Sequence, residues 1–79
     1  MDKKIEEMIA LGVAYGINCQ YCMEYHKKKA LEAGLTQEEM LSAIEVADAV
    51  KRGAYNKTKE DTSKLFGEIT ASGCCLAGN

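Results

Sequence analysis

The sequence lacks proline, internal repeats and any glycine-rich loop of the kind that binds phosphate. It also lacks the strict alternation of apolar and polar residues that is typical of half-buried strands. Apolar residues instead recur at helical spacing, and glycines separate these stretches. We therefore expect an all-α fold, a small helical domain of about four helices.

Strong charge and long apolar runs are missing as well. The net charge is −2, which gives no indication of nucleic acid as a partner. The longest uncharged run, residues 8–23, is shorter than the roughly 18–20 residues that a membrane span needs. Acidic residues near the start do not fit the basic region of a signal peptide. We expect a cytoplasmic protein with no nucleic acid and no membrane as partners.

The chain is short for a stable monomer. Its 79 residues bury only roughly 60–65% of the surface that the unfolded chain exposes. We interpret residues 1–71 as a single helical domain and residues 72–79 as a flexible tail that contains two cysteines. The first helix, expected over residues 2–16, is apolar or small on every face from Met8 onward. Because such a helix is buried on most sides, we expect a homo-oligomer.

Two residues define the expected second helix, which covers residues 19–33. Asn18 precedes it and is of a type that favours the N-cap position. Gly34 follows it in the position where glycine commonly ends a helix.

The expected third helix covers residues 37–52. Thr36 and Glu39 have the spacing of a capping box at its start. Gly53 is expected to end this helix, and a fourth, more polar helix is expected over residues 54–71. The residues of the third helix that are expected to face inward are Met40, Ala43, Ile44, Ala47 and Val50.

A C-x-x-C motif followed by the only histidine is the chemically richest part of the chain. Cys19, Cys22 and His26 lie within one short stretch at the start of the expected second helix. Cysteines three residues apart in the first turn have a Cα separation of roughly 5 Å, which is compatible with a disulfide. The helix N-terminus also favours the thiolate form of a cysteine. His26 lies one turn after Cys22 on the same face, where it can accept the thiol proton or pair with the thiolate.

Glu7 has two interpretations. As an acid in the first turn, it is typical of a solvated residue that stabilises the helix N-terminus. It also shares a stripe with Ala10, Leu11 and Ala14, and this stripe can point inward. If the first two helices form an antiparallel hairpin, Glu7 and His26 stand ~15 Å and ~13.5 Å from the turn, and so at the same level. A carboxylate there would orient the ring and help to move a proton.

The same residues are compatible with other sites. A zinc site would use Cys19, Cys22, His26 and a tail cysteine, Cys74 or Cys75. Structural zinc sites usually place C-x-x-C in a turn, however, and the chain has no second C-x-x-C. A non-catalytic zinc- or metal-binding module is therefore the alternative to a redox site. A third interpretation is a purely structural group of core side chains.

In combination, these residues resemble the carboxymuconolactone decarboxylase superfamily, and in particular its alkylhydroperoxidase D-like members. The redox members of that family carry a glutamate, eleven residues and then C-x-x-C-x-x-x-H, which corresponds here to Glu7, Cys19, Cys22 and His26. The stretch 30–39 also resembles the helix–glycine–helix join of the family. The resemblance implies an all-α fold and a homo-oligomer, commonly a trimer or hexamer.

The resemblance further implies a mechanism. Cys22 would react with peroxide and pass through a sulfenic acid, and Cys19 would resolve it as a Cys19–Cys22 disulfide. His26 and Glu7 would relay the proton that activates Cys22. We expect no cofactor and no metal. The resemblance implies a lipoylated or thioredoxin-like dithiol protein as reductant and a small hydroperoxide or disulfide as substrate.

Two features depart from the family pattern. Tyr21 stands where alkylhydroperoxidase D has a second histidine, so we expect a weaker proton relay and a lower peroxidase activity. The vicinal pair Cys74–Cys75 is also not part of the pattern. Both departures fit a protein that acts chiefly on disulfides, with the tail cysteines carrying reducing equivalents. The overall prediction is a thiol-dependent oxidoreductase.

Overall fold

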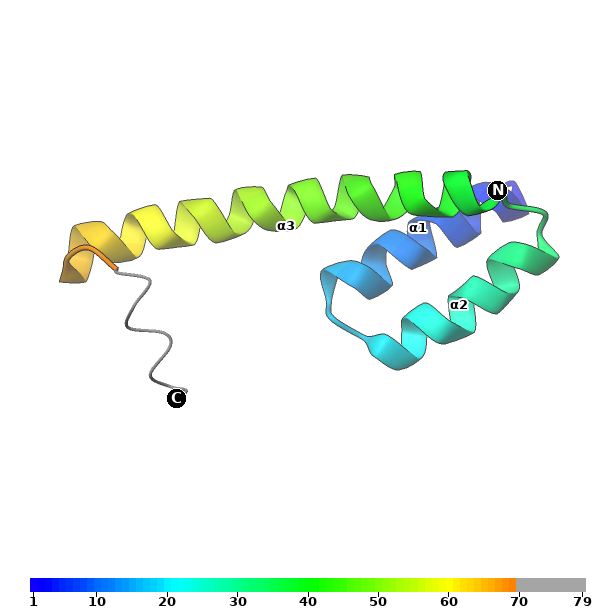
Figure 1. The fold of residues 1–79 in the computed structure, drawn as a ribbon, viewed down its shortest axis with the longest axis horizontal. Helices are drawn as coiled ribbons and strands as arrows, with labels where there is room; N and C mark the ends of the chain where they lie inside the picture. Colours follow the sequence, from blue (N-terminus) through cyan, green and yellow to red (C-terminus); the bar gives the residue numbers. More distant parts are fainter. Residues whose placement is uncertain (70–79) are drawn as a thin grey trace.

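The computed structural model describes residues 1–69, which form three helices and no strand. These are α1 (Lys3–Gly16), α2 (Gln20–Glu32) and α3 (Gln37–Phe66) (Figure 1). The prediction of an all-α fold is confirmed. None of the helices within residues 1–69 combines the length and the apolar character needed to cross a membrane. The last two residues of the expected domain, 70–71, and the expected tail, 72–79, lie outside the described residues.

Helix α1 packs against both other helices. α2 returns antiparallel to α1, and the first half of α3 runs beside α1 in the same direction (Figure 1). Side-chain contacts agree, because Lys4 at the start of α1 lies near Gly34 and Tyr15 at its end bonds Asp48 of α3. The buried apolar side chains that hold this arrangement come from all three helices and the second turn: Leu11, Ala14, Ala30, Leu35 and Met40.

Both short helices end in the same way. The residue after each C-cap has a positive φ, 58° at Asn18 and 92° at Gly34. The amide of that residue bonds a carbonyl three residues back, and the next amide bonds a carbonyl five residues back. This pattern is the Schellman motif. The prediction that Asn18 caps the second helix is therefore wrong, because an N-cap has an extended backbone. The N-cap of α2 is Cys19.

Helix α3 is one continuous helix of 30 residues. The prediction that Gly53 ends the third helix and that a fourth helix follows is wrong. Gly53 does not adopt the positive φ found at Gly34 and Gly67, and an interior glycine costs only about 0.5–1 kcal/mol relative to alanine. The capping box at the start of α3 is confirmed, with Thr36 and Glu39 each bonding the backbone amide of the other.

Val50 is the exception among the residues expected to face inward from the third helix. Its exposed fraction is 68%, whereas Met40 is buried. Val50 shares its exposure with Val46, one turn earlier on α3. The apolar pattern of α3 is therefore wider than the surface that α1 covers.

Candidate functional site

The N-terminus of α2 presents both cysteines of the motif. Cys19 and Cys22 form a disulfide across the first turn, with a Cα–Cα distance of 5.2 Å. The sulfur of Cys19, the N-cap residue, also accepts a hydrogen bond from the backbone amide of Cys22 at 3.1 Å. Because helix N-termini stabilise negative charge, the same position favours a thiolate when the disulfide is reduced.

A carboxylate and an imidazole meet between α1 and α2. Glu7 Oε1 lies 2.9 Å from His26 Nδ1. Glu7 is buried, with an exposed fraction of 9%, and the His26 side chain is 30% exposed. The two helices thus bring these residues to the same level, as the hairpin estimate predicts, and Glu7 is not a solvated first-turn acid.

The histidine is held from two directions. Its Nδ1 engages Glu7, which leaves Nε2 as the nitrogen that can exchange a proton with a neighbouring group. The ring of Tyr25 packs edge-on against the His26 ring, with 5.0 Å between the ring centroids. His26 follows Cys22 by one helical turn, and the structure records no hydrogen bond between these two within residues 1–69. The sulfur of Cys22 is instead bonded to Cys19, and it becomes available to the imidazole only on reduction.

A second polar cluster holds the turn before Cys19. Lys51 of α3 donates hydrogen bonds to the Tyr15 carbonyl at 3.0 Å and to Asn18 Oδ1 at 2.7 Å. The Tyr15 hydroxyl donates to Asp48 at 2.7 Å, and Arg52 donates to the same carboxylate at 2.8 Å. Reasoning from the sequence missed this cluster, because most of its contacts join residues more than thirty positions apart. Only the Asp48–Arg52 spacing gave a local signal.

Hydrogen bonding shifts the pKa values of two groups in this cluster, Tyr15 and Asp48. The hydrogen bond to Asp48 raises the pKa of the Tyr15 hydroxyl above its ordinary value. The same hydrogen bond, together with Arg52, lowers the pKa of the Asp48 carboxyl. A neutral phenol and an ionised carboxylate therefore stabilise each other over a wide range of pH.

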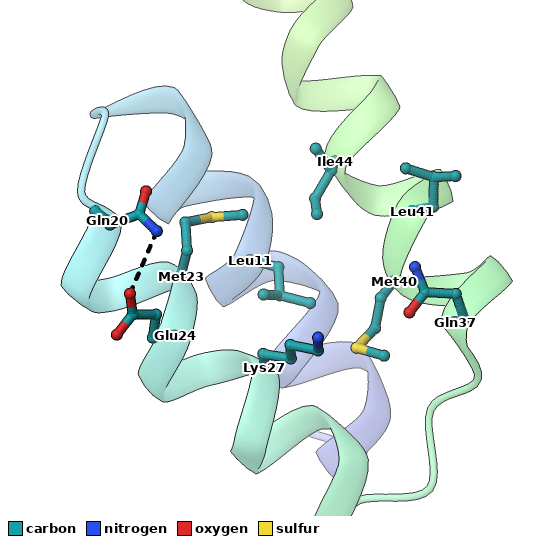
Figure 2. Close-up of a pocket in the computed structure, with 9 residues that line it drawn as sticks. All are labelled: Leu11, Gln20, Met23, Glu24, Lys27, Gln37, Met40, Leu41 and Ile44. Atoms are coloured by element: carbon teal, nitrogen blue, oxygen red, sulfur yellow. Dashed lines mark hydrogen bonds between the residues drawn. The ribbon is translucent and has the colours of Figure 1, made fainter.

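An apolar groove begins beside Cys19. Cys19 lines a recess of about 220 Å³, together with Gln20 and Met23. Those two neighbours also line a larger groove of about 350 Å³ between α2 and α3. In Figure 2, Leu11 of α1 forms its floor, and a hydrogen bond joins Gln20 to Glu24 at the rim. Apolar walls with a few polar groups suit an organic ligand.

The alternative metal site is not assembled by the described residues. Within residues 1–69, no three side chains of the metal-binding types come together. Cys74 and Cys75, which that alternative requires, lie outside the described part of the chain.

Comparison with known proteins identifies related sequences. The sequence model described as the carboxymuconolactone decarboxylase family matches residues 1–55. The uncharacterized protein 4 in the cox locus of Paracoccus denitrificans is 39% identical over 54 residues, which cover 68% of this chain and 49% of that protein. The alkyl hydroperoxide reductase AhpD of Mycobacteroides abscessus is 38% identical over 50 residues, 63% of this chain and 29% of that protein. The chain thus spans about half the length, or less, of these curated relatives. No solved structure matches it significantly.

Proposed function

The chain belongs to the carboxymuconolactone decarboxylase family, and on that premise we propose that it is a thiol-dependent oxidoreductase that reduces a hydroperoxide or a disulfide. The observation that supports this proposal most is the Cys19–Cys22 disulfide at the start of α2, with the Glu7–His26 pair one turn further along. A reversible disulfide and a proton-exchanging imidazole are the two components that two-electron thiol chemistry requires.

With a hydroperoxide as substrate, the Cys22 thiolate attacks the O–O bond. A sulfur–oxygen bond forms, Cys22 becomes a sulfenic acid, and the substrate leaves as an alcohol after protonation. The Cys19 thiol then attacks the Cys22 sulfur, which forms the disulfide and releases water. A dithiol reductant returns two electrons and two protons and becomes a disulfide itself. With a disulfide as substrate, Cys22 forms a mixed disulfide that Cys19 resolves.

His26 transfers protons in both the hydroperoxide and the disulfide reaction. It accepts the thiol proton of Cys22 and later delivers a proton to the leaving oxygen or sulfur. Glu7 acts through His26: its carboxylate fixes the ring orientation and stabilises the imidazolium that forms when the ring takes up a proton. This division of roles follows from the Nδ1 contact, which leaves Nε2 for exchange.

The proposed steps need no cofactor and no metal. The reductant would be a lipoylated or thioredoxin-like dithiol protein, and the organic part of a substrate or reductant would lie in the apolar groove that begins beside Cys19. Tyr21, which is 76% exposed, favours the disulfide-reductase version, since the relay lacks a second histidine. A cytoplasmic location and a trimeric or hexameric assembly stay predictions.

The test is native mass spectrometry of the purified protein before and after a brief peroxide pulse, with peptide mapping of the cysteines. We expect a loss of two hydrogens on the peptide that holds Cys19 and Cys22, which a dithiol reverses. The double variant Cys74→Ser/Cys75→Ser should give the same result. A zinc-sized increment that shields Cys19 and Cys22 from oxidation would contradict the proposal and favour the metal-binding module.

A further inference from the structure

The groove between α2 and α3 differs in chemistry from one end to the other. One end adjoins the recess beside Cys19, because Gln20 and Met23 line both the recess and the groove. The middle of the groove is mostly apolar, and two of its lining side chains, Leu11 and Met40, are buried. The opposite end carries polar and charged side chains from both walls. A ligand that lies along the groove therefore meets a disulfide at one end and polar groups at the other.

Lys27 is the only basic side chain among the described residues that line this groove. Figure 2 shows its side chain extended across the groove toward Met40. Within residues 1–69 the structure records no ion pair of Lys27, whereas Lys29, half a turn further along α2, pairs with Glu32 at 4.0 Å. The ammonium group of Lys27 is thus available to an anion that enters the groove.

The acidic side chain of the groove, Glu24, does not face this ammonium group. Its carboxylate accepts a hydrogen bond from Gln20 at 3.3 Å, and Figure 2 shows it turned toward that residue. On the opposite wall, Gln37 contributes an amide group from the first position of α3. A helix N-terminus favours negative charge, so the surroundings of Lys27 suit a carboxylate.

The distance from the motif to Lys27 sets the length of the ligand. Lys27 follows Cys19 by two helical turns, which correspond to ~12 Å along α2. An extended hydrocarbon chain advances ~1.3 Å per carbon, so about nine or ten carbons cover this distance. The groove volume of about 350 Å³ lies in the range of small-molecule sites. Because the Cys22 sulfur is bonded to that of Cys19, a group that reaches Cys19 also lies beside Cys22.

We propose that this groove binds a substrate that has a terminal carboxylate on a medium-length hydrocarbon chain, and that Lys27 binds the carboxylate. The reacting group, a hydroperoxide, lies at the other end of the chain. The inference rests on the proposed function and adds a substrate class and a specificity-determining residue to it. The reaction is the one described above: the O–O bond breaks, Cys22 takes the terminal oxygen as a sulfenic acid, and the product is a hydroxy acid.

Two variants of the full chain isolate the charge of Lys27. Lys27→Met keeps an unbranched side chain and removes the ammonium group. Lys28→Met makes the same change at the next position, which does not line the groove, and is the matched control. Both lysines are exposed, and methionine is as good a helix former as lysine. Both variants should therefore keep the helical circular dichroism of the wild type.

Two substrates that differ only in charge test the specificity. These are ω-hydroperoxydecanoic acid and its methyl ester, with dithiothreitol as the reductant. We expect kcat/KM of the wild type to be roughly tenfold higher for the acid, because a hydrogen bond to a charged group contributes at least that much. Lys27→Met should lower this ratio to about one, and Lys28→Met should leave it unchanged. The shorter ω-hydroperoxybutanoic acid cannot span the groove and should show no preference over its ester.

A ratio near one in the wild type, or a ratio that Lys27→Met retains, would overturn the inference while the proposed function stands. Decanoate, which carries no reacting group, measures the same contact without turnover. In NMR titrations of the reduced protein it should shift the amide signals of residues 20–27 and 37–44, and Lys27→Met should raise its dissociation constant roughly tenfold. Shifts confined to the groove between α1 and α3 would also overturn the inference. Binding through Lys27 without turnover of either hydroperoxide would contradict the proposed function and leave the carboxylate site in place.

Discussion

Two polar clusters flank the disulfide, and they differ in kind. The first pairs the buried Glu7 carboxylate of α1 with the imidazole of His26, one helical turn after Cys22. The second fixes the turn before Cys19 through the contacts of Lys51, which lies on α3. An imidazole exchanges protons at neutral pH, whereas in the second cluster the pKa of the Tyr15 hydroxyl is raised and the pKa of the Asp48 carboxyl is lowered, both away from neutral pH. We infer that the first cluster moves protons and that the second fixes the shape of the motif.

The largest effect is expected at the sulfur itself. Cys22→Ser should abolish turnover, because the hydroxyl at position 22 neither ionises near neutral pH nor forms a disulfide. Steady-state reduction of a hydroperoxide and of a disulfide by the same preparation measures this loss. Full activity would contradict the mechanism, and the double variant Cys74→Ser/Cys75→Ser, tested with a small dithiol, is the control for the other thiols.

The second largest effect on turnover is expected when the imidazole of His26 is removed. His26→Ala should slow turnover by at least ~10², since a positioned general base typically contributes that much. Free imidazole in the assay should restore part of the rate, which distinguishes lost proton transfer from lost packing. An unchanged rate without imidazole would show that the first cluster does not move protons.

Substitution of Glu7 should slow turnover less than loss of the imidazole, because Glu7 acts only through the His26 ring. Glu7→Gln should lower the rate roughly tenfold and shift the pH profile of the rate, since an amide no longer stabilises the imidazolium. The matched control is Glu6→Gln, the neighbouring acid, which forms a surface pair with Lys3 at 3.7 Å. Equal effects of the two substitutions would mean that the buried carboxylate has no special role.

The second cluster should affect stability rather than rate. The pKa of Asp48 is lowered from 3.8 and the pKa of Tyr15 is raised from 10.0. The hydrogen bond between Tyr15 and Asp48 therefore stabilises the fold fully between about pH 4 and pH 10. Its contribution is lost as pH falls through the lowered pKa of Asp48 and as pH rises through the raised pKa of Tyr15.

Tyr15→Phe should accordingly unfold at lower urea concentration than the wild type at pH 7, and the difference should narrow below pH 3.8. Its turnover should stay within about twofold of the wild type. Tyr55→Phe, at an exposed tyrosine away from the motif, is the control and should change neither quantity. A large loss of turnover in Tyr15→Phe would contradict the claim that the second cluster affects stability and not the reaction.

Local patterns in the sequence predicted much of the fold. Apolar spacing identified the helices, and the capping box at Thr36 marked the start of α3. The Glu7–His26 contact followed from two helix lengths and one turn, because the hairpin brings residues at equal distances from that turn together. These predictions succeeded where a single helix or a single hairpin determines the answer.

The two errors about helix ends have different physical causes. Asparagine is a residue type that favours the N-cap position, which is why Asn18 was expected to cap α2. In the structure its backbone is left-handed, and its side chain accepts a hydrogen bond from Lys51, which lies far along the chain. Gly53 was expected to end a helix, but its φ is not positive, as it is at the glycines that end helices here. The Lys51 contact joins residues far apart in the sequence, whereas α3 continues because an interior glycine costs only about 0.5–1 kcal/mol relative to alanine.

The most direct test of the redox account is to trap the intermediate on Cys22. In the reduced Cys19→Ser variant, a sulfenic acid formed at position 22 lacks its proposed resolving partner, and a dimedone probe added with a stoichiometric hydroperoxide should label it. We predict an adduct on Cys22 that is absent from the Cys22→Ser variant. An adduct found only on Cys74 or Cys75, or no adduct at any cysteine while peroxide is consumed, would contradict the central claim.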